Sequence, residues 1–373
     1  MVMKKNIEDF LPPHIRALHP YVPGKPIEEV ERELKISAIK LASNENPLGP
    51  SPRAMEAMRE YVGKVHRYPD GQGFYLRRKL AERFGLDPDQ VLLGAGTTDI
   101  IEMVAKAFLQ GQAEGVTAEG SFVMYYVVAQ MLGAALHCVP LKNYTYDLDA
   151  IAEAITPRIR VVFFANPNNP TGTYVRAREI DGLLDRIPDD VLLVLDEAYA
   201  EYVDDPEYSH SLDYVRQGRN VLVLRTFSKV YGLAGLRVGY GLGVSNLVNC
   251  LNLVRGPFNT ASIAQEAAMA AMDDDAHVRD SVENNRREMR WLCEQFGRLC
   301  LRYVPSAANF LLVDTGRDAN ETFQLLLRQG VIVRPMKENG FPTAFRVTIG
   351  RHDENVRFIE SLERAGMTAP VPA

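Results

Sequence analysis

One lysine, Lys229, stands where a side-chain amine could act as a nucleophile. It follows the apolar run 221–224, with Thr226 and Ser228 just before it and a glycine-rich turn ending in Arg237 after it. Ligands of α/β folds bind at the carboxyl ends of strands, and two hydroxyls with an arginine are suited to hold a phosphate group. A lysine beside a captured phosphate can form a Schiff base with pyridoxal phosphate. A lysine in an exposed loop is the alternative.

A second anion-binding pattern lies earlier in the chain. The predicted strand 91–93 runs into Gly94-Ala95-Gly96-Thr97-Thr98-Asp99, and helical periodicity follows over 100–109. The free N–H groups and the dipole at such a helix start attract a phosphate. Because the third glycine of the dinucleotide fingerprint is missing, the pattern does not predict that type of nucleotide-binding fold. An ordinary N-capped helix is the alternative.

Two further predicted strands also end in polar residues. The segment 166–172, with three asparagines and two prolines, follows the strand 160–165, and Asp196-Glu197-Ala198-Tyr199 follows the apolar run 191–195. That apolar run is typical of a strand buried on both faces of a parallel sheet. A buried acid at its end needs a cationic or hydrogen-bonding partner, and a protonated pyridine nitrogen would be one. An ordinary turn and a helix cap are the alternatives.

The C-terminal third contributes two arginines in apolar surroundings. Arg334 ends the predicted strand 331–334, and Arg346 lies in the predicted strand 345–349. An arginine directed inward from such a strand needs an anion as its partner. Two surface charges are the alternative.

The composition is that of an ordinary globular enzyme. The chain has 373 residues, 46% hydrophobic and 24% charged, which suffices for two or three structural units. Its net charge of −6 gives no basic surface for nucleic acid. We expect no membrane span and no signal peptide, because no apolar run has the required length or place. The four cysteines lack the spacing of a metal site, so we predict no bound metal and a reducing cytoplasm.

The alternation of strands and helices predicts an α/β fold. Up to residue 260 we expect strands at 91–93, 115–118, 135–140, 160–165, 191–195, 221–224 and 238–242, and helices at 51–61, 74–84, 100–109, 122–132, 149–155 and 179–185. Beyond it we expect long helices at 261–272 and 276–300, then one helix at 321–329 among strands at 302–304, 310–313, 331–334 and 345–349. The chain is thus divided into an N-terminal arm 1–35, a large domain 36–260 and a smaller α/β domain 261–373.

Taken in this order, the motifs resemble those of the fold-type I pyridoxal-phosphate-dependent aminotransferases. The motifs that carry this resemblance are Gly94-Ala95-Gly96-Thr97, Asn169-Pro170-Thr171-Gly172, Asp196-Glu197-Ala198-Tyr199, Ser228-Lys229 and Gly235-Leu236-Arg237. Four more are similar to those of histidinol-phosphate aminotransferases: Asn44-Glu45-Asn46-Pro47, Arg67-Tyr68-Pro69, Val333-Arg334-Pro335 and Arg346-Val347-Thr348-Ile349-Gly350. The resemblance implies a three-layer large domain with a mixed, mostly parallel sheet.

The resemblance also implies a role for each matching residue. Lys229 would be the catalytic residue that bonds to pyridoxal phosphate, and Asp196 would pair with the pyridine nitrogen. The other cofactor contacts would be Asn169 and Tyr199 at the phenolic oxygen, Phe122 stacked on the ring, and Gly96, Thr97, Thr226, Ser228 and Arg237 at the phosphate. Tyr68 would reach the cofactor of a neighbouring subunit in a homodimer with shared active sites. Arg346 would bind the substrate carboxylate, with Tyr21, Asn46 and Arg334 around the variable part of the substrate.

One segment departs from the family pattern. Gly120-Ser121-Phe122 stands where the family usually has Pro-Thr-Tyr. Stacking on a cofactor ring needs an aromatic face rather than a hydroxyl, so Phe122 can fill that role. The loss of the proline leaves the shape of this loop open.

The resemblance implies transamination of L-histidinol phosphate with 2-oxoglutarate, which gives imidazole acetol phosphate and glutamate. An aromatic amino acid aminotransferase would use the same catalytic residues. A decarboxylase acting on a phosphorylated amino acid is a further alternative on the same fold. The effector domain of a regulator is a less favoured one, because 35 N-terminal residues without helix-turn-helix spacing cannot supply a DNA-binding domain.

Overall fold

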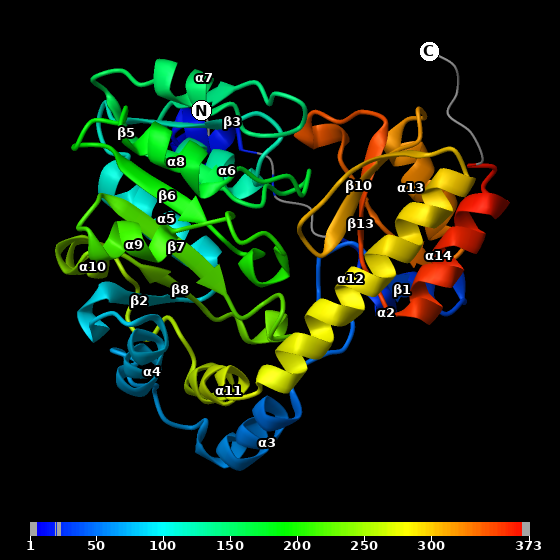
Figure 1. Cartoon of the computed structure of the whole chain (residues 1–373), viewed down its shortest axis with the longest axis horizontal. Helices are drawn as coiled ribbons and strands as arrows, with labels where there is room; N and C mark the ends of the chain where they lie inside the picture. The colour runs from blue at the N-terminus through cyan, green and yellow to red at the C-terminus, as the bar shows by residue number, and fades with distance from the viewer. Residues whose placement is uncertain (1–5, 19, 21–23, 368–373) are drawn as a thin grey trace, which may run out of the picture.

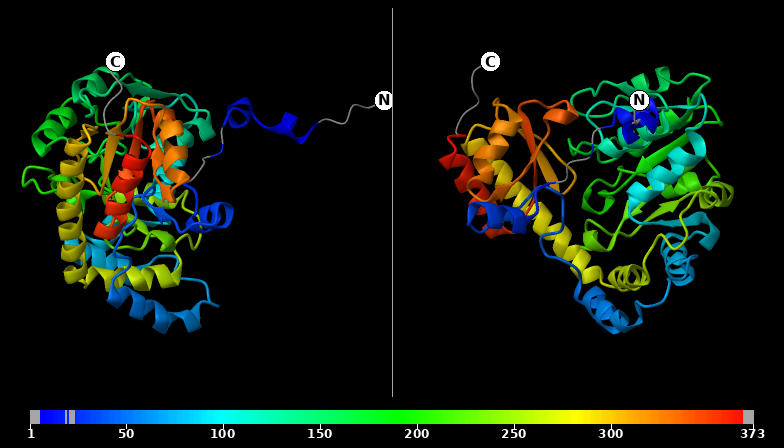
Figure 2. Two further views of the ribbon diagram at one scale, coloured as in Figure 1. Left: turned by 90° about the vertical axis from the view of Figure 1, so that its right-hand side faces the viewer. Right: turned by 180° about the vertical axis from the view of Figure 1, so that it is seen from behind.

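The computed structural model describes residues 6–18, 20 and 24–367, and it consists of a large and a small body (Figure 1). The large body lies on the left of the view and the small body on the right. The long helix α12 (Asp275–Arg298) runs diagonally from one to the other. In the left-hand view of Figure 2 the N-terminal segment with η1 (Ile7–Phe10) projects away from both.

A seven-stranded sheet forms the centre of the large body. Its strands follow the order β2 (Val91–Gly94), β8 (Gly239–Leu242), β7 (Val221–Thr226), β6 (Leu192–Asp196), β5 (Ile159–Ala165), β3 (Glu114–Ala118) and β4 (Leu136–Val139). Only β8 runs antiparallel to its neighbours, β2 and β7. The predicted fold class, α/β with a mixed and mostly parallel sheet, is confirmed.

Helices cover both faces of this sheet, which makes three layers. They are α5 (Thr97–Phe108), α6 (Val123–Leu132), α7 (Leu148–Glu153), α8 (Ala177–Leu184), α9 (Ser211–Arg216) and α10 (Ser245–Asn252). Helix α5 packs against β2, β7 and β8, and it comes to the front in the rear view of Figure 2. The central strands are buried along their whole length, β6 being an example. This burial explains their continuous apolar sequences.

Three helices extend the large body below the sheet. They are α3 (Pro52–Tyr61), α4 (Phe74–Phe84) and α11 (Ser262–Met272), and α11 packs against both others. Helix α3 has the predicted start, because the hydroxyl of Ser51 accepts a hydrogen bond from the Ala54 N–H and Pro52 stands at the first position.

The small body is a four-stranded antiparallel sheet backed by helices. Its strand order is β12 (Arg334–Pro335), β13 (Ala344–Thr348), β10 (Phe310–Asp314) and β9 (Arg302–Val304). Helices α12, α13 (Ala319–Leu327) and α14 (His352–Arg364) pack with these strands. A separate parallel pair joins β1 (Ile39–Lys40) to β11 (Val331–Ile332).

The packing bears on where the two bodies divide. Ala264, Ala268 and Met272 of α11 belong to the core of the large body. Val30 of α2 (Ile27–Leu34) packs with Ile332, on the other side of the molecule. The division at residues 35 and 260 stays a prediction. We propose that segment 27–42 be counted with the small body and that the second boundary lies within α12.

Some predicted elements differ from the structure. The prediction of one helix after residue 302 is wrong, because α14 buries Phe358, Ile359 and Leu362 although most of its other residues are polar. The predicted strand 331–334 is two strands in different sheets, since β11 pairs with β1 and β12 with β13. Helices α9 and α10 were not predicted, and α5 begins at Thr97 rather than at residue 100.

Within the described part of the chain, no helix is both long and apolar enough to cross a membrane. The same residues include no group of three histidine, cysteine, aspartate or glutamate side chains placed to hold a metal ion.

A buried ion pair between Arg225 of β7 and Glu197, the residue after β6, provides a test of the large core. The Glu197 carboxylate is fully buried and accepts hydrogen bonds from Arg225 at 2.8 Å and Ser211 at 3.0 Å. Removal of Arg225 would leave a buried charge without its cation. We expect Arg225→Ala to lower the free energy of unfolding by about 3–5 kcal/mol, measured by urea denaturation. Arg59→Ala removes an exposed pair with Glu56 and should cost less than about 1 kcal/mol; equal losses would contradict this reading.

Candidate active site

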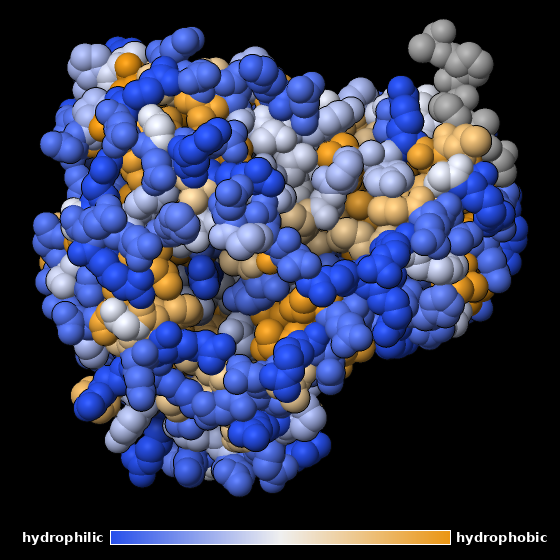
Figure 3. Space-filling model, in the orientation of Figure 1, coloured by the Kyte–Doolittle hydropathy of each residue, from blue (hydrophilic) through white to orange (hydrophobic). Residues whose placement is uncertain are grey.

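A cavity of about 810 Å³ lies at the carboxyl ends of β3, β5, β6 and β7. Parallel strands place their carboxyl ends at one edge of the sheet, where ligands bind in such folds. The loops after these strands supply one wall and the small body supplies the other. On the face shown in Figure 3 the surface is mainly hydrophilic, with hydrophobic residues gathered in the depression beside α12. Predicted site residues that line the cavity are Thr97, Phe122, Asn169, Asp196, Tyr199, Thr226, Ser228, Lys229, Arg237, Arg334 and Arg346.

Lys229 lies just beyond β7 and reaches into this cavity. Its Nζ donates a hydrogen bond to the Ser43 carbonyl at 3.2 Å and lies 5.7 Å from the centre of the Tyr199 ring. The loss of water around the ammonium group lowers the pKa of Lys229 to about 7, and the positive charge of Arg346 acts in the same direction. A substantial share of this amine is therefore neutral and nucleophilic near pH 7.

Asp196, the last residue of β6, faces the same cavity. One carboxylate oxygen accepts a hydrogen bond from the Tyr125 hydroxyl at 2.9 Å, and the other accepts one from the Ala198 N–H at 3.2 Å. Burial raises the pKa of Asp196 to about 6, against the effect of these donors. A cation that entered the cavity would favour the ionised form.

Two residues predicted to hold a phenolic oxygen lie between Lys229 and the small body. The Tyr199 hydroxyl accepts a hydrogen bond from Nδ2 of Asn44 at 2.9 Å. The Asn169 side-chain oxygen accepts one from the guanidinium of Arg346. Both polar groups belong to the cavity wall.

The predicted phosphate-binding residues are brought together at the start of α5. Gly96 is the N-cap of α5, with φ +83°, and no side chain caps this helix end. A Cβ atom on Gly96 would lie 2.3 Å from a terminal nitrogen of Arg237, so the close approach requires glycine. Arg237 also lies 3.5 Å from the Ser228 hydroxyl, and the Thr226 hydroxyl accepts the Ser228 N–H at 3.0 Å. Uncapped amides, hydroxyls and a guanidinium form a cradle for an anion.

The loop that departs from the family pattern has a specific shape. Gly120 has φ +62°, which proline cannot adopt because its ring holds φ near −65°. A Cβ atom there would also lie 2.9 Å from the ring of Phe341 in the small body. The Ser121 hydroxyl donates to the Asn168 side chain at 2.9 Å. The glycine thus allows Phe341 to pack on this loop while Phe122 still lines the cavity.

The two predicted arginines lie side by side on the small sheet. Arg334 of β12 and Arg346 of β13 are cross-strand partners, and both line the cavity. Arg346 is buried, donates to the Ala42 carbonyl at 2.7 Å and lies 5.3 Å from the Phe310 ring centre. Together the two guanidiniums bring concentrated positive charge to the wall opposite the sheet.

Among the described residues, the predicted Tyr68 and Asn46 do not line this cavity, and Gly96 adjoins it only through its neighbour Thr97. Tyr68 is 83% exposed and stacks on Phe258 with 4.9 Å between ring centres. The Asn46 amide donates instead to the Val230 carbonyl at 2.7 Å and to the Ser281 hydroxyl at 2.9 Å. Tyr21 lies outside the described residues.

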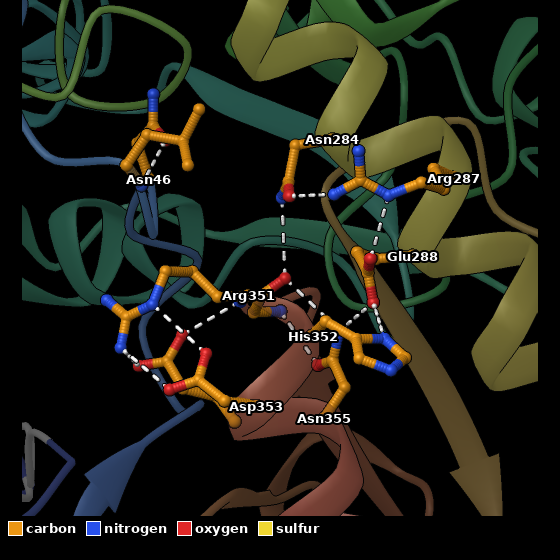
Figure 4. A network of polar contacts seen from close by, with 11 residues as sticks. Asn46, Asn284, Arg287, Glu288, Arg351, His352, Asp353 and Asn355 are labelled. Atoms are coloured by element: carbon orange, nitrogen blue, oxygen red, sulfur yellow. Dashed lines mark hydrogen bonds and ion pairs between the residues drawn. The ribbon is translucent and has the colours of Figure 1, made fainter.

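Helix α12 connects these elements through polar contacts (Figure 4). Asn46 binds α12 near its start, and further along the helix the Asn284 amide lies 3.4 Å from the Gly350 carbonyl. Glu288 on the same helix accepts hydrogen bonds from His352 at 3.1 Å and Asn355 at 3.2 Å. The helix thereby holds the loop that follows Lys229 and the end of the strand that carries Arg346.

The sequence did not single out Asn44 or Tyr125, although both bind site residues. Asn44 has φ +55° and binds Tyr199, while its own N–H donates to the Thr348 hydroxyl at 2.9 Å. Its local signal is its place in the polar loop around Pro47, from which the sequence analysis took Asn46 instead. Tyr125 lies in an apolar helix and carries no local signal of its bond to Asp196.

Comparisons with known proteins agree on one family. A family model described as "Aminotransferase class I and II" matches residues 36–362. The chain is 50% identical over 350 residues to "Histidinol-phosphate aminotransferase" of Moorella thermoacetica, covering 93% of this chain and 91% of that protein. It is 50% identical over 355 residues to "Histidinol-phosphate aminotransferase 2" of Pseudomonas fluorescens, covering 94% and 96%. The solved structure of histidinol-phosphate aminotransferase from Sinorhizobium meliloti in complex with pyridoxal-5'-phosphate has a TM-score of 0.87 at 26% identity, covering 95% of this chain and 97% of that one.

The lowered pKa of Lys229 predicts an unusual reactivity. A lysine with the ordinary pKa is only about 0.04% neutral at pH 7, whereas Lys229 should be about half neutral there. Pulses of acetic anhydride from pH 6 to 10, followed by peptide mass spectrometry, should show the labelling of Lys229 levelling off by about pH 8. The exposed Lys142, labelled in the same pulses, is the control, and the two labelling profiles should differ in shape. Parallel profiles, each scaled to its own maximum, would contradict the assignment.

Proposed function

Because the chain belongs to the class I and II aminotransferases, we propose that it transfers the amino group of L-histidinol phosphate to 2-oxoglutarate. The products are imidazole acetol phosphate and glutamate, and the cofactor is pyridoxal phosphate. Two curated relatives at 50% identity over more than nine-tenths of the chain carry the name of this activity. The observation that carries the proposal in the structure is the placement of Lys229 and Asp196 at neighbouring strand ends of one cavity.

The residues present fit the cofactor. The start of α5, with Gly96 and Thr97, would hold its phosphate together with Thr226, Ser228 and Arg237. Asn169 and Tyr199 would hold the phenolic oxygen, Phe122 would stack on the ring, and Asp196 would face the ring nitrogen. When bound, pyridoxal phosphate supplies an aldehyde that bonds to amines and a ring that accepts electron density.

Lys229 has two tasks in this proposal. With the cofactor bound, its neutral Nζ would serve as the nucleophile toward the aldehyde that the cofactor supplies, which requires the unprotonated amine present near pH 7. Once an incoming amine has displaced it, the same nitrogen takes the α-proton of the substrate as a general base. The same nitrogen would then give up that proton again. Release of the carbonyl product consumes one water molecule, and the 2-oxo acid takes up the amino group in the reverse sequence. One amine would serve both as nucleophile and as general base, because a substrate bound in the cavity would lie beside Nζ.

Asp196 keeps the ring nitrogen protonated. Its pKa near 6 in the absence of a cation falls when a positive charge lies opposite, so the carboxylate is ionised when it is needed. A buried carboxylate and a buried cation stabilise one another, since neither is solvated by water.

Arg346 and Arg334 recognise the anionic part of each substrate. Guanidinium groups bind carboxylates and phosphates in a bidentate manner. We propose that Arg346 binds the carboxylate of glutamate and 2-oxoglutarate, and that Arg334 adds charge for the phosphate of histidinol phosphate. An aromatic amino acid offers this pair a carboxylate with a single negative charge, whereas the phosphate of histidinol phosphate carries up to two.

We expect turnover of histidinol phosphate with 2-oxoglutarate, measured as glutamate released by the protein loaded with pyridoxal phosphate. Lys229→Ala should abolish it, and Arg346→Ala should raise KM for 2-oxoglutarate about tenfold or more, because a charged hydrogen bond is lost. Arg364→Ala, an exposed arginine of the small body paired with Glu360, is the control and should leave KM unchanged.

Competition between donors tests the substrate. Histidinol phosphate should be consumed before phenylalanine or tyrosine at equal concentration. The reverse order would keep the enzyme class and identify an aromatic aminotransferase. Carbon dioxide released without any 2-oxo acid would identify a decarboxylase.

We also propose that the enzyme is a homodimer with shared active sites, in which Tyr68 reaches the partner's cofactor phosphate. Tyr68 and Phe258 form a stacked pair that is 83% and 48% exposed, outside the cavity of their own chain. Burial of two such rings against a second copy would stabilise a symmetric dimer. The cytoplasmic location stays a prediction.

Mixing two inactive variants tests the shared site. Tyr68→Ala and Lys229→Ala each damage one half of every site in their own homodimers. After joint unfolding and refolding, mixed dimers should carry one intact site each, so about a quarter of the unaltered activity should return in a closed two-fold dimer. No recovery, with mixed dimers demonstrated by differential tags, would contradict the role of Tyr68.

A further inference from the structure

Tyr125 is a buried tyrosine directly behind the cavity wall. It lies on α6, is fully buried and does not itself line the cavity. Its hydroxyl donates a hydrogen bond to Oδ2 of Asp196 at 2.9 Å. The two residues are 71 positions apart in the chain and come from a helix and a strand.

Packing fixes the place of this hydroxyl. The Tyr125 ring stacks on Phe163 of β5, with 5.0 Å between centres and 8° between planes. It also meets Phe122 edge-on, at 5.6 Å and 90°. Tyr125 therefore contacts both Phe122, proposed to stack on the cofactor ring, and Asp196, proposed to pair with the ring nitrogen.

The hydroxyl also determines how the carboxylate is held. One Asp196 oxygen accepts from Tyr125 and the other from the Ala198 N–H, so donors on two sides orient the group toward the cavity. Other titratable groups coupled to this carboxylate are Glu197, Lys229, Tyr146 and Tyr208. Burial raises the pKa of Asp196, and the hydrogen bond from Tyr125 is the largest effect that opposes this rise.

We propose that Tyr125 is a positioning residue of the active site, whose hydroxyl holds the Asp196 carboxylate oriented and ionised toward the ring nitrogen of the cofactor. This inference rests on the proposed function. It gives the buried tyrosine a role in cofactor affinity rather than in the chemical step. Tyr125 donates to the carboxylate from behind, so the cavity face of Asp196 stays available for the ring.

Tyr125→Phe tests the proposal, because it removes the hydroxyl and keeps the ring between Phe122 and Phe163. Pyridoxal phosphate is titrated onto the ligand-free chain between pH 6.5 and 8.5, with binding followed by visible absorbance. Loss of a hydrogen bond to a buried charge should weaken binding about tenfold at pH 6.5. The deficit should shrink toward pH 8.5, where Asp196 ionises without help. Unchanged affinity, or a deficit equal at every pH, would overturn the proposal.

Tyr214→Phe is the matched control. Tyr214 is also buried and donates to an aspartate, Asp181, at 2.7 Å, but it lies away from the cavity. Tyr214→Phe should leave the affinity for pyridoxal phosphate unchanged. If it lowered this affinity as much as Tyr125→Phe does, the effect of Tyr125→Phe would be general destabilisation and the proposal would be overturned.

A double variant distinguishes failure of this proposal from failure of the proposed function. In an Asp196→Asn chain, Tyr125→Phe should add less than about a twofold further loss, because the two residues act as a unit. An additive loss would overturn the role of Tyr125 alone. An Asp196→Asn chain with full affinity and full turnover would overturn the role of Asp196 and this proposal with it.

Discussion

The parallel pairing of β3, β5, β6 and β7 is the constraint on which the rest of the structure depends. Residues far apart in the chain reach one cavity because each follows a strand that ends at the same edge of the sheet. Asn169 follows β5, Asp196 ends β6 and Lys229 follows β7. A shift of one residue in the register of β6 would turn the Asp196 side chain to the opposite face of the sheet, since alternate side chains point to opposite faces. The apolar core that fixes the register is therefore part of the site.

The site contains two ionisable groups whose pKa values both lie near neutral pH. The protein raises the pKa of Asp196 to about 6 and lowers that of Lys229 to about 7, in both cases chiefly by excluding water. This costs folding free energy, and hydrogen bonds from Tyr125 and to Ser43 only partly offset it. The same cost prepares the site for a cofactor that brings a phosphate and a ring cation. We infer that a bound cofactor, with its phosphate and ring cation, would offset much of this desolvation cost.

The sequence predicted what is local and missed what depends on long-range contacts. Lys229, Asp196 and Arg237 could be found because each stands at a strand end or a glycine-rich turn. The sequence analysis named Asn46 and passed over Asn44, because the role of Asn44 depends on its left-handed backbone and on its bond to Thr348, 304 positions away. Helix α14 was missed because its burial comes from packing against the small sheet. Where the chain divides depends on long-range contacts as well, since α11 packs against α3 and α4 and shares the large core.

The cavity exists only because two bodies meet, and this limits how the loop around Gly120 can vary. Arg346 bonds to Asn169 across the boundary, and Phe341 packs against the backbone of Gly120. A proline at position 120 would fix φ at a value that this contact does not allow. The ring at position 122 nevertheless still lines the cavity, because Tyr125, itself stacked on Phe163, packs against it edge-on. The departure from the family pattern therefore changes how the loop meets the small body while the stacking surface is kept. A glycine here and an aromatic residue at 341 should vary together, since each makes room for the other.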